Sequence, residues 1–182
     1  MKRLDRSFFN RNTLTVAQEL LGKFVIRKID QKKIVSQIVE TEAYMGFDDL
    51  ASHASKGKTE RTKIMFDKPG IAYIYMIYGM YYCFNIVTEK KDFPAAVLIR
   101  AIKPINNENI DYADIKTDGP GKLCRFLEIN KDFNGEDLIT FSNLWIEDRG
   151  TIVSKNNIDT AKRIGVDYAK HCANYPWRFY LK

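Results

Sequence analysis

Hydrophobic and polar positions follow patterns typical of β-strands along most of the chain. Apolar, β-favouring runs cover residues 24–29, 33–44 and 94–102, and a run of seventeen residues without a formal charge covers 71–87. Short apolar runs bounded by polar turns predict strands. The break at Asp30-Gln31-Lys32 indicates a hairpin between the first two runs, so an antiparallel sheet is expected.

The uncharged run 71–87 contains five of the ten tyrosines of the chain. It is slightly shorter than the ~18 apolar residues that suggest a membrane helix, and tyrosines, a glycine and an asparagine are poorly suited to a membrane core. We therefore expect two strands, about 71–78 and 81–87, that reverse at Gly79-Met80. Tyr73 and Tyr75 would share one strand face and Tyr78 the other. Tyr78, beside the turn, is the tyrosine most suited to exposure.

Helical patterns are shorter. Residues 13–21 predict a helix that Thr13 or Thr15 can cap, and Gly119-Pro120-Gly121 opens a second, because proline favours the first helical turn. A third helix is expected near 159–170, and a closing strand at 177–181. The polar segments 45–68 and 105–118 are long loops, the first of a length that is often functional and the second expected to be a mobile excursion. Together these elements predict one α+β domain over residues 1–182.

Composition adds bounds rather than a function. A chain of 182 residues with 45% hydrophobic content suits one globular domain. Its net charge of +6 is compatible with nucleic acid, an anionic membrane surface or acidic substrates, and selects none of them. The start has no secretory pattern, and the three cysteines have no paired spacing, so we expect a cytoplasmic protein with reduced thiols and no disulfide framework or zinc site.

Two carboxylates and two further polar residues interrupt the predicted strands. Glu40 and Glu42 are two apart, so both point to one face, where repulsion would raise the pKa of one and suit it to act as a general base. Carboxylates are mostly exposed, however, and a solvated sheet face is the favoured interpretation from pattern alone. Asn85 and Arg100 lie inside apolar runs, and pairing of their strands would bring them to Glu42. A pocket and a set of structural contacts are then equally supported.

The polar loop and the tyrosines suggest a nucleic-acid surface. His53 lies in the loop, and Arg61, Lys63 and Lys68 flank the tyrosine-rich run. Cations that bind phosphates beside rings that stack on bases are typical of such surfaces. A solvated loop beside a tyrosine-filled core is the alternative, and a lone histidine is more often neither catalytic nor a ligand.

Several motifs resemble those of the alkyladenine, or 3-methylpurine, DNA glycosylases, in order from about residue 8 to 181. These motifs are VETEAY (39–44), ASH (51–53), TxR (59–61), MFxKPGxxYxYxIYGMYxCxN (65–85), LIRAIKP (98–104), GPGKLCRFL (119–127), RIGVDYA (163–169) and PWRFYL (176–181). The resemblance implies a curved antiparallel sheet, flanking helices and a protruding, tyrosine-bearing β-hairpin that enters the minor groove of DNA.

The resemblance also implies roles at matched positions. Glu42 would activate water, with Arg100 holding it. The pocket for a flipped base would be formed by Tyr44, Ala51, His53, Tyr75 and Asn85, with Asn85 disfavouring the 2-amino group of guanine. Tyr78 would fill the gap left in the base stack, and Arg61 and Met65 would lie at the DNA surface.

The implied reaction is removal of alkylated or deaminated purines from double-stranded DNA, which leaves an abasic site for base excision repair. It needs no metal and no cofactor, and the resemblance suggests a monomer that does not bind a membrane. Two alternatives remain open: a non-catalytic nucleic-acid-binding module that uses the same basic and aromatic face, and a small-molecule hydrolase with Glu42 as its base.

Overall fold

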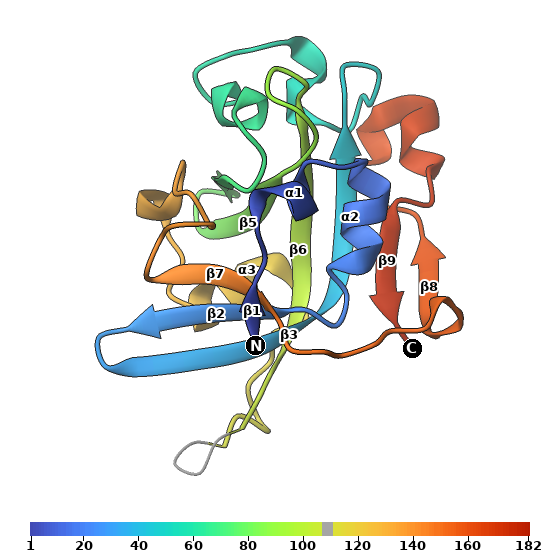
Figure 1. The fold of residues 1–182 in the computed structure, drawn as a ribbon. Helices are drawn as coiled ribbons and strands as arrows, with labels where there is room; N and C mark the ends of the chain where they lie inside the picture. The colour runs from blue at the N-terminus through green and yellow to red at the C-terminus, as the bar shows by residue number, and fades with distance from the viewer. Residues whose placement is uncertain (107–110) are drawn as a thin grey trace.

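A computed structural model describes residues 1–106 and 111–182. These residues form one antiparallel sheet in the order β1-β7-β2-β3-β6-β5-β4, which β9 extends by pairing with β3, and β8 by pairing with β9 (Figure 1). The strands are β1 (Lys2–Arg3), β2 (Phe24–Ile29), β3 (Lys32–Met45), β4 (Ala72–Ile77), β5 (Tyr81–Val87), β6 (Ala95–Pro104), β7 (Leu144–Asp148), β8 (Ile158–Ala161) and β9 (Arg178–Leu181). The predicted α+β class is confirmed.

The helices are short and lie around the sheet. They are α1 (Arg6–Phe9), α2 (Thr13–Glu19) and α3 (Pro120–Phe126), with 3-10 helices η1 (His53–Lys56), η2 (Lys63–Phe66), η3 (Lys131–Phe133), η4 (Lys155–Asn157) and η5 (Asp167–Asn174). Asn12, rather than Thr13 or Thr15, caps α2, because its side chain accepts hydrogen bonds from the amides of Leu14 and Thr15. Among the described residues no helix is long and apolar enough to cross a membrane.

Strand β3 is the centre of the sheet. Its first half pairs with β2, and its second half lies between β6 and β9. The pairing with β6 changes register on both sides of Glu40. Such irregularities bend a strand, and Figure 1 shows β3 turning there from the β2 hairpin to run alongside β6. The sheet is therefore bent at the carboxylates that the sequence singled out.

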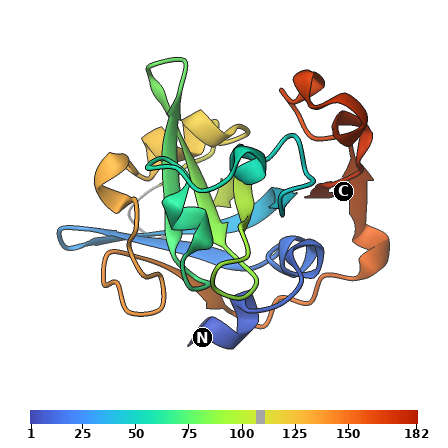
Figure 2. The ribbon, with the colours of Figure 1, turned by 90° about the horizontal axis from the view of Figure 1, so that it is seen from above.

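Strands β4 and β5 form the predicted tyrosine-rich hairpin, whose tip projects from the body of the molecule in Figure 2. The reversal spans Tyr78 to Met80, one residue earlier than expected, with Tyr78 and Gly79 at φ angles of 52° and 68°. Two successive left-handed residues match the twist of a hairpin. Helix α3 packs against β5, which lies between β4 and β6 in the sheet.

The helix predicted near 159–170 is wrong. Residues 158–161 form β8, because their backbone groups pair with the closing strand β9. A 3-10 helix begins only at Asp167, and it is interrupted at Lys170, which has a φ angle of 50°. Of the predicted excursion 105–118, residues 107–110 lie outside the described part of the chain.

Candidate active site

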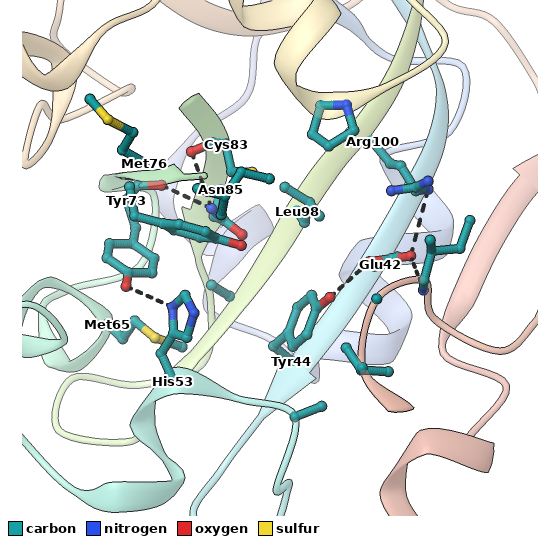
Figure 3. A pocket seen from close by; sticks show the side chains of 18 of the residues that line it. Glu42, Tyr44, His53, Met65, Tyr73, Met76, Cys83, Asn85, Leu98 and Arg100 are labelled. Carbon is teal, nitrogen blue, oxygen red and sulfur yellow. Dashed lines mark hydrogen bonds and ion pairs between the residues drawn. The ribbon is translucent and has the colours of Figure 1, made fainter. Parts of the chain in front are cut away.

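Three neighbouring strands bring the predicted polar residues together. Glu42 of β3 and Asn85 of β5 are both opposite Leu98 of β6, and Arg100 is two residues further along β6 on the same face. The predicted convergence is confirmed. Figure 3 shows Glu42 and Arg100 on one side of the resulting pocket, with His53 and Tyr73 on the other.

The pocket is a cavity of about 540 Å³, within the usual range for ligand sites. The sheet forms its floor, and the hairpin, the loop before β4 and the segment after β8 form its walls. All of the site residues predicted from the sequence line it: Glu42, Tyr44, Ala51, His53, Arg61, Met65, Tyr75, Tyr78, Asn85 and Arg100.

Glu42 is buried, with 1% of its side chain exposed. Its Oε2 accepts a hydrogen bond from the Tyr44 hydroxyl at 2.8 Å, and its Oε1 accepts one from the Ile164 amide at 2.9 Å. Burial raises the pKa of Glu42, against the opposing effects of Arg100 and these two hydrogen bonds. The favoured solvated-face interpretation is therefore wrong for Glu42. Repulsion from Glu40 also raises this pKa, but less than burial does.

Arg100 is paired with a carboxylate, as a cation inside an apolar run requires. Its Nε donates to Oε1 of Glu40 at 3.0 Å and lies 3.6 Å from Oε1 of Glu42. Arg178 of β9 donates to the same Glu40 oxygen at 2.8 Å. Glu40 therefore accepts hydrogen bonds from two guanidinium groups. Arg100 lies closer to Glu40 than to Glu42.

The opposite wall is aromatic. His53 Nδ1 lies 3.0 Å from the Tyr73 hydroxyl, and the His53 ring meets the Tyr75 ring edge-on, with centroids 4.5 Å apart. Burial, with a smaller contribution from Arg61, lowers the pKa of His53 to about 4, so His53 is neutral at pH 7. Tyr73 lines the cavity, although the sequence assigned it no role in the site. Its place on the same strand face as Tyr75 was the signal that it borders the pocket.

Asn85 has both of the roles that its sequence position left open, a structural contact and a place in the pocket. Its Nδ2 donates to the carbonyl oxygens of Tyr73 at 3.1 Å and Cys83 at 3.4 Å, so it fastens the hairpin. The side chain also lines the cavity.

The three residues expected to face DNA differ in exposure. Tyr78 is 83% exposed at the hairpin tip, and Arg61 is exposed with its guanidinium 5.4 Å from the Tyr75 ring centre. Met65 is not at the surface: it is 2% exposed and packs with Phe66 and Tyr73 under the cavity. An apolar side chain on η2 gains more from this cluster than from solvent.

A third wall was not assigned from the sequence, although the motif RIGVDYA that forms it was noted. Arg163 is fully buried and binds both carboxylate oxygens of Asp49, at 2.6 and 2.7 Å, with its guanidinium 4.8 Å from the Tyr44 ring centre. Ile164 follows directly and donates its amide to Glu42. The ion pair thus ties this wall to the loop after β3.

The fold and the pocket indicate a class of protein: an enzyme whose cavity holds a buried carboxylate opposite aromatic rings that suit a flat ligand. Comparison with known proteins identifies the family. The model of the methylpurine-DNA glycosylase family matches residues 7–182, and the chain belongs to this family of DNA-repair enzymes, which hydrolyse N-glycosyl bonds.

Proteins from three organisms illustrate the similarity, which extends over nearly the whole chain. A protein of Desulfitobacterium hafniense is 45% identical over 198 residues, which cover 100% of this chain and 96% of that protein. A protein of Methanocella arvoryzae is 49% identical, and the match covers 98% of this chain and 92% of that protein. A protein of Legionella pneumophila is 45% identical, and the match covers 100% of this chain and 96% of that protein. All three are named provisionally as 3-methyladenine DNA glycosylases.

Proposed function

We propose that the cavity receives a damaged purine flipped out of duplex DNA and that the enzyme hydrolyses the bond between this base and deoxyribose. The substrates would be of the 3-methyladenine, 7-methylguanine and hypoxanthine class. One observation carries the proposal: Glu42 is buried and hydrogen-bonded on the side of the cavity opposite His53 and Tyr73.

Access to the base requires that it leave the duplex, at a cost of a few kcal/mol that is least for damaged or mispaired bases. Tyr78 would occupy the vacated space, because it is exposed at the tip of a projecting hairpin. Arg61, exposed at the cavity wall, would bind the phosphate backbone. Met65 would support the pocket from below instead of touching DNA.

The base would be held by Tyr44, His53 and Tyr75. An alkylated purine carries positive charge and is attracted to electron-rich ring faces. A neutral His53 suits such a ligand, because a protonated imidazole would repel it. The amide of Asn85 is fixed by two backbone carbonyl groups, so it cannot turn away from the 2-amino group of a normal guanine.

In the chemical step, a water molecule would give a proton to Glu42 while its oxygen bonds to C1′ of the sugar. The bond from C1′ to the purine nitrogen breaks through an oxocarbenium-like state. Its electron pair leaves with the base, and an alkylated, positively charged purine departs as a neutral molecule. A raised pKa makes Glu42 a stronger base for this step. The product is an abasic site in an uncut strand.

The test is release of free base from duplex DNA that contains methylated adenine or hypoxanthine. We expect free base and an equal amount of alkali-labile sites. Binding of these duplexes without release would favour the non-catalytic nucleic-acid-binding module. Hydrolysis of small glycosides together with intact lesion DNA would favour the small-molecule hydrolase.

A further inference from the structure

We infer that Glu40 is a positioning residue, which holds Arg100 back from a hydrogen bond to Glu42 and so keeps the Glu42 carboxylate free to accept a proton. The inference rests on the proposed role of Glu42 in the reaction. It concerns the carboxylate that the sequence placed beside Glu42 and that the proposed mechanism does not use.

The distances separate the two carboxylates. Nε of Arg100 is 3.0 Å from Oε1 of Glu40, which is a hydrogen bond, and 3.6 Å from Oε1 of Glu42, which is beyond one. Glu40 and Glu42 reach the same cation because they lie on one face of β3, where the register with β6 shifts. Arg100 thus has a choice of two partners, and the geometry gives it to Glu40.

The arrangement is partly shielded from water. The exposed fractions of the side chains are 15% for Arg100, 17% for Glu40 and 23% for Arg178. Arg178 also donates its Nε to the carbonyl of Lys162, which fixes it beside Glu40. Charges in such a setting interact more strongly than at an open surface. A substitution at Glu40 therefore changes the position of Arg100 and, through Arg100, the electrostatic environment of Glu42.

Without Glu40, Arg100 would have only Glu42 as its carboxylate partner within this cluster. Both Glu42 oxygens already accept a hydrogen bond, from Tyr44 and from Ile164. A third, charged donor would lower the tendency of Glu42 to take a proton from water. Glu40 thus binds the cation while leaving Glu42 basic.

Other titratable groups also surround Glu42 and are unchanged by this exchange of partners. They are Tyr44 from β3, Tyr75 and Cys83 from the hairpin, and Arg163 from the segment after β8. Among the described groups that act on Glu42, Glu40 is the one further carboxylate. Removal of the Glu40 carboxylate therefore changes the net charge near Glu42, whereas loss of a neutral tyrosine would not.

The test is the pH dependence of single-turnover base release from a hypoxanthine-containing duplex. In Glu40→Gln, Arg100 moves to Glu42, so the acid limb shifts to lower pH and the plateau rate falls about tenfold, short of the 10²–10⁴-fold that a general base contributes. In Arg178→Met, Glu40 loses its other guanidinium partner and binds Arg100 alone. A positive charge near Glu42 is also lost, so the acid limb shifts to higher pH. Opposite shifts from two partners of one ion cluster are not a consequence of lost stability.

Glu147→Gln is the matched control. Glu147 of β7 accepts hydrogen bonds from Trp145 and Arg149, does not line the cavity, and has 10% of its side chain exposed. We expect it to leave both limb and plateau unchanged, and thermal unfolding checks that each variant is folded. Should Glu40→Gln not fold, Arg178→Met still decides.

An acid limb that stays in place in the folded variants, or that moves the same way in both, would overturn the inference and make Glu40 purely structural. A wild-type protein that releases no base would instead overturn the proposed function, so the two failures are distinguishable.

Discussion

At the scale of single residues, Glu42 shows the conflict between stability and the proposed chemistry. A carboxylate is costly to bury, and its two hydrogen bonds and Arg100 offset only part of that cost, because its pKa stays raised. The charged form is therefore less favoured in the folded protein than in the unfolded chain. The burial that destabilises the charged form of Glu42, and with it the fold, is also what would make Glu42 a stronger base.

Glu42→Gln should accordingly stabilise the protein at neutral and alkaline pH. A folded-state pKa above the unfolded one means that the wild type loses stability as pH rises from the unfolded pKa through the folded one. The neutral amide lacks this dependence. We expect a higher Tm for the variant at pH 8, by about 2–4 °C for each kcal/mol relieved, and a smaller difference at pH 4. A variant less stable than the wild type at pH 8 would contradict the account.

Tyr78 should matter for binding and not for folding, because 83% of its side chain is exposed. Tyr78→Ser should weaken binding to lesion DNA by about 1–3 kcal/mol, the usual contribution of an aromatic ring stacked on a base, with an unchanged Tm. Ile152→Ser, at a residue that is 94% exposed and does not line the cavity, is the control and should change neither. A large fall in Tm for Tyr78→Ser would mean that Tyr78 supports the core.

At the scale of elements, the tyrosine-rich hairpin packs against helix α3. A β-carbon at Gly121 would lie 2.8 Å from Cδ1 and 3.0 Å from Cβ of Tyr81, so α3 approaches β5 more closely than any other residue would allow. Arg125 of the same helix lies over the Tyr81 ring at 5.7 Å. The projecting tip is thus supported from one side.

Gly121→Ala should destabilise the protein by about 1–3 kcal/mol through overpacking, although alanine is the better helix former by about 1 kcal/mol. Gly119→Ala is the control, because nothing lies within 4 Å of a β-carbon there and its backbone is extended. Gly119 is the N-cap of α3, where alanine is less favourable than glycine, so this substitution should cost under about 1 kcal/mol. Chemical denaturation measures both. An equal effect of the two substitutions would show that Tyr81 moves aside without cost.

The buried ion pair of Asp49 and Arg163 joins two walls of the pocket. Both side chains are 0% exposed, and Arg163 also donates to the carbonyls of Ala43 and Cys172. Asp49→Asn should cost about 3–5 kcal/mol, because it leaves a buried charge without its partner. Asp148→Asn, which breaks a pair with Lys23 that is 38% exposed on the Asp148 side, should cost under about 1 kcal/mol. Similar losses in the two variants would show that the buried pair carries no special weight.

At the scale of the whole molecule, the sequence predicts the strands better than it predicts their neighbours. Alternation identified β2, β3, the hairpin and β6, because each has its own apolar pattern. It failed for β8, whose partner β9 lies about twenty residues further along the chain. The burial of Glu42 was unpredictable for a related reason: one of its hydrogen bonds comes from the backbone amide of Ile164, and an amide carries no sequence signal.

The site itself was found in two ways. Polar residues inside apolar strands indicated that Glu42, Asn85 and Arg100 meet, and this needed only strand pairing. The motif resemblance added the loop and turn residues His53, Arg61 and Tyr78, for which no periodicity exists. Neither revealed how Glu40 shares Arg100, because that depends on a local register shift in β3.

The central claim is that the Glu42 carboxylate activates the water that releases the base from DNA. The most direct test compares base release with DNA binding in Glu42→Gln. The variant keeps the shape of the side chain and an oxygen for the Ile164 amide. We expect single-turnover release of hypoxanthine from duplex DNA to fall by about 10²–10⁴-fold, the contribution of a general base, with an unchanged dissociation constant for the lesion duplex. Undiminished release by a folded Glu42→Gln protein would contradict the claim.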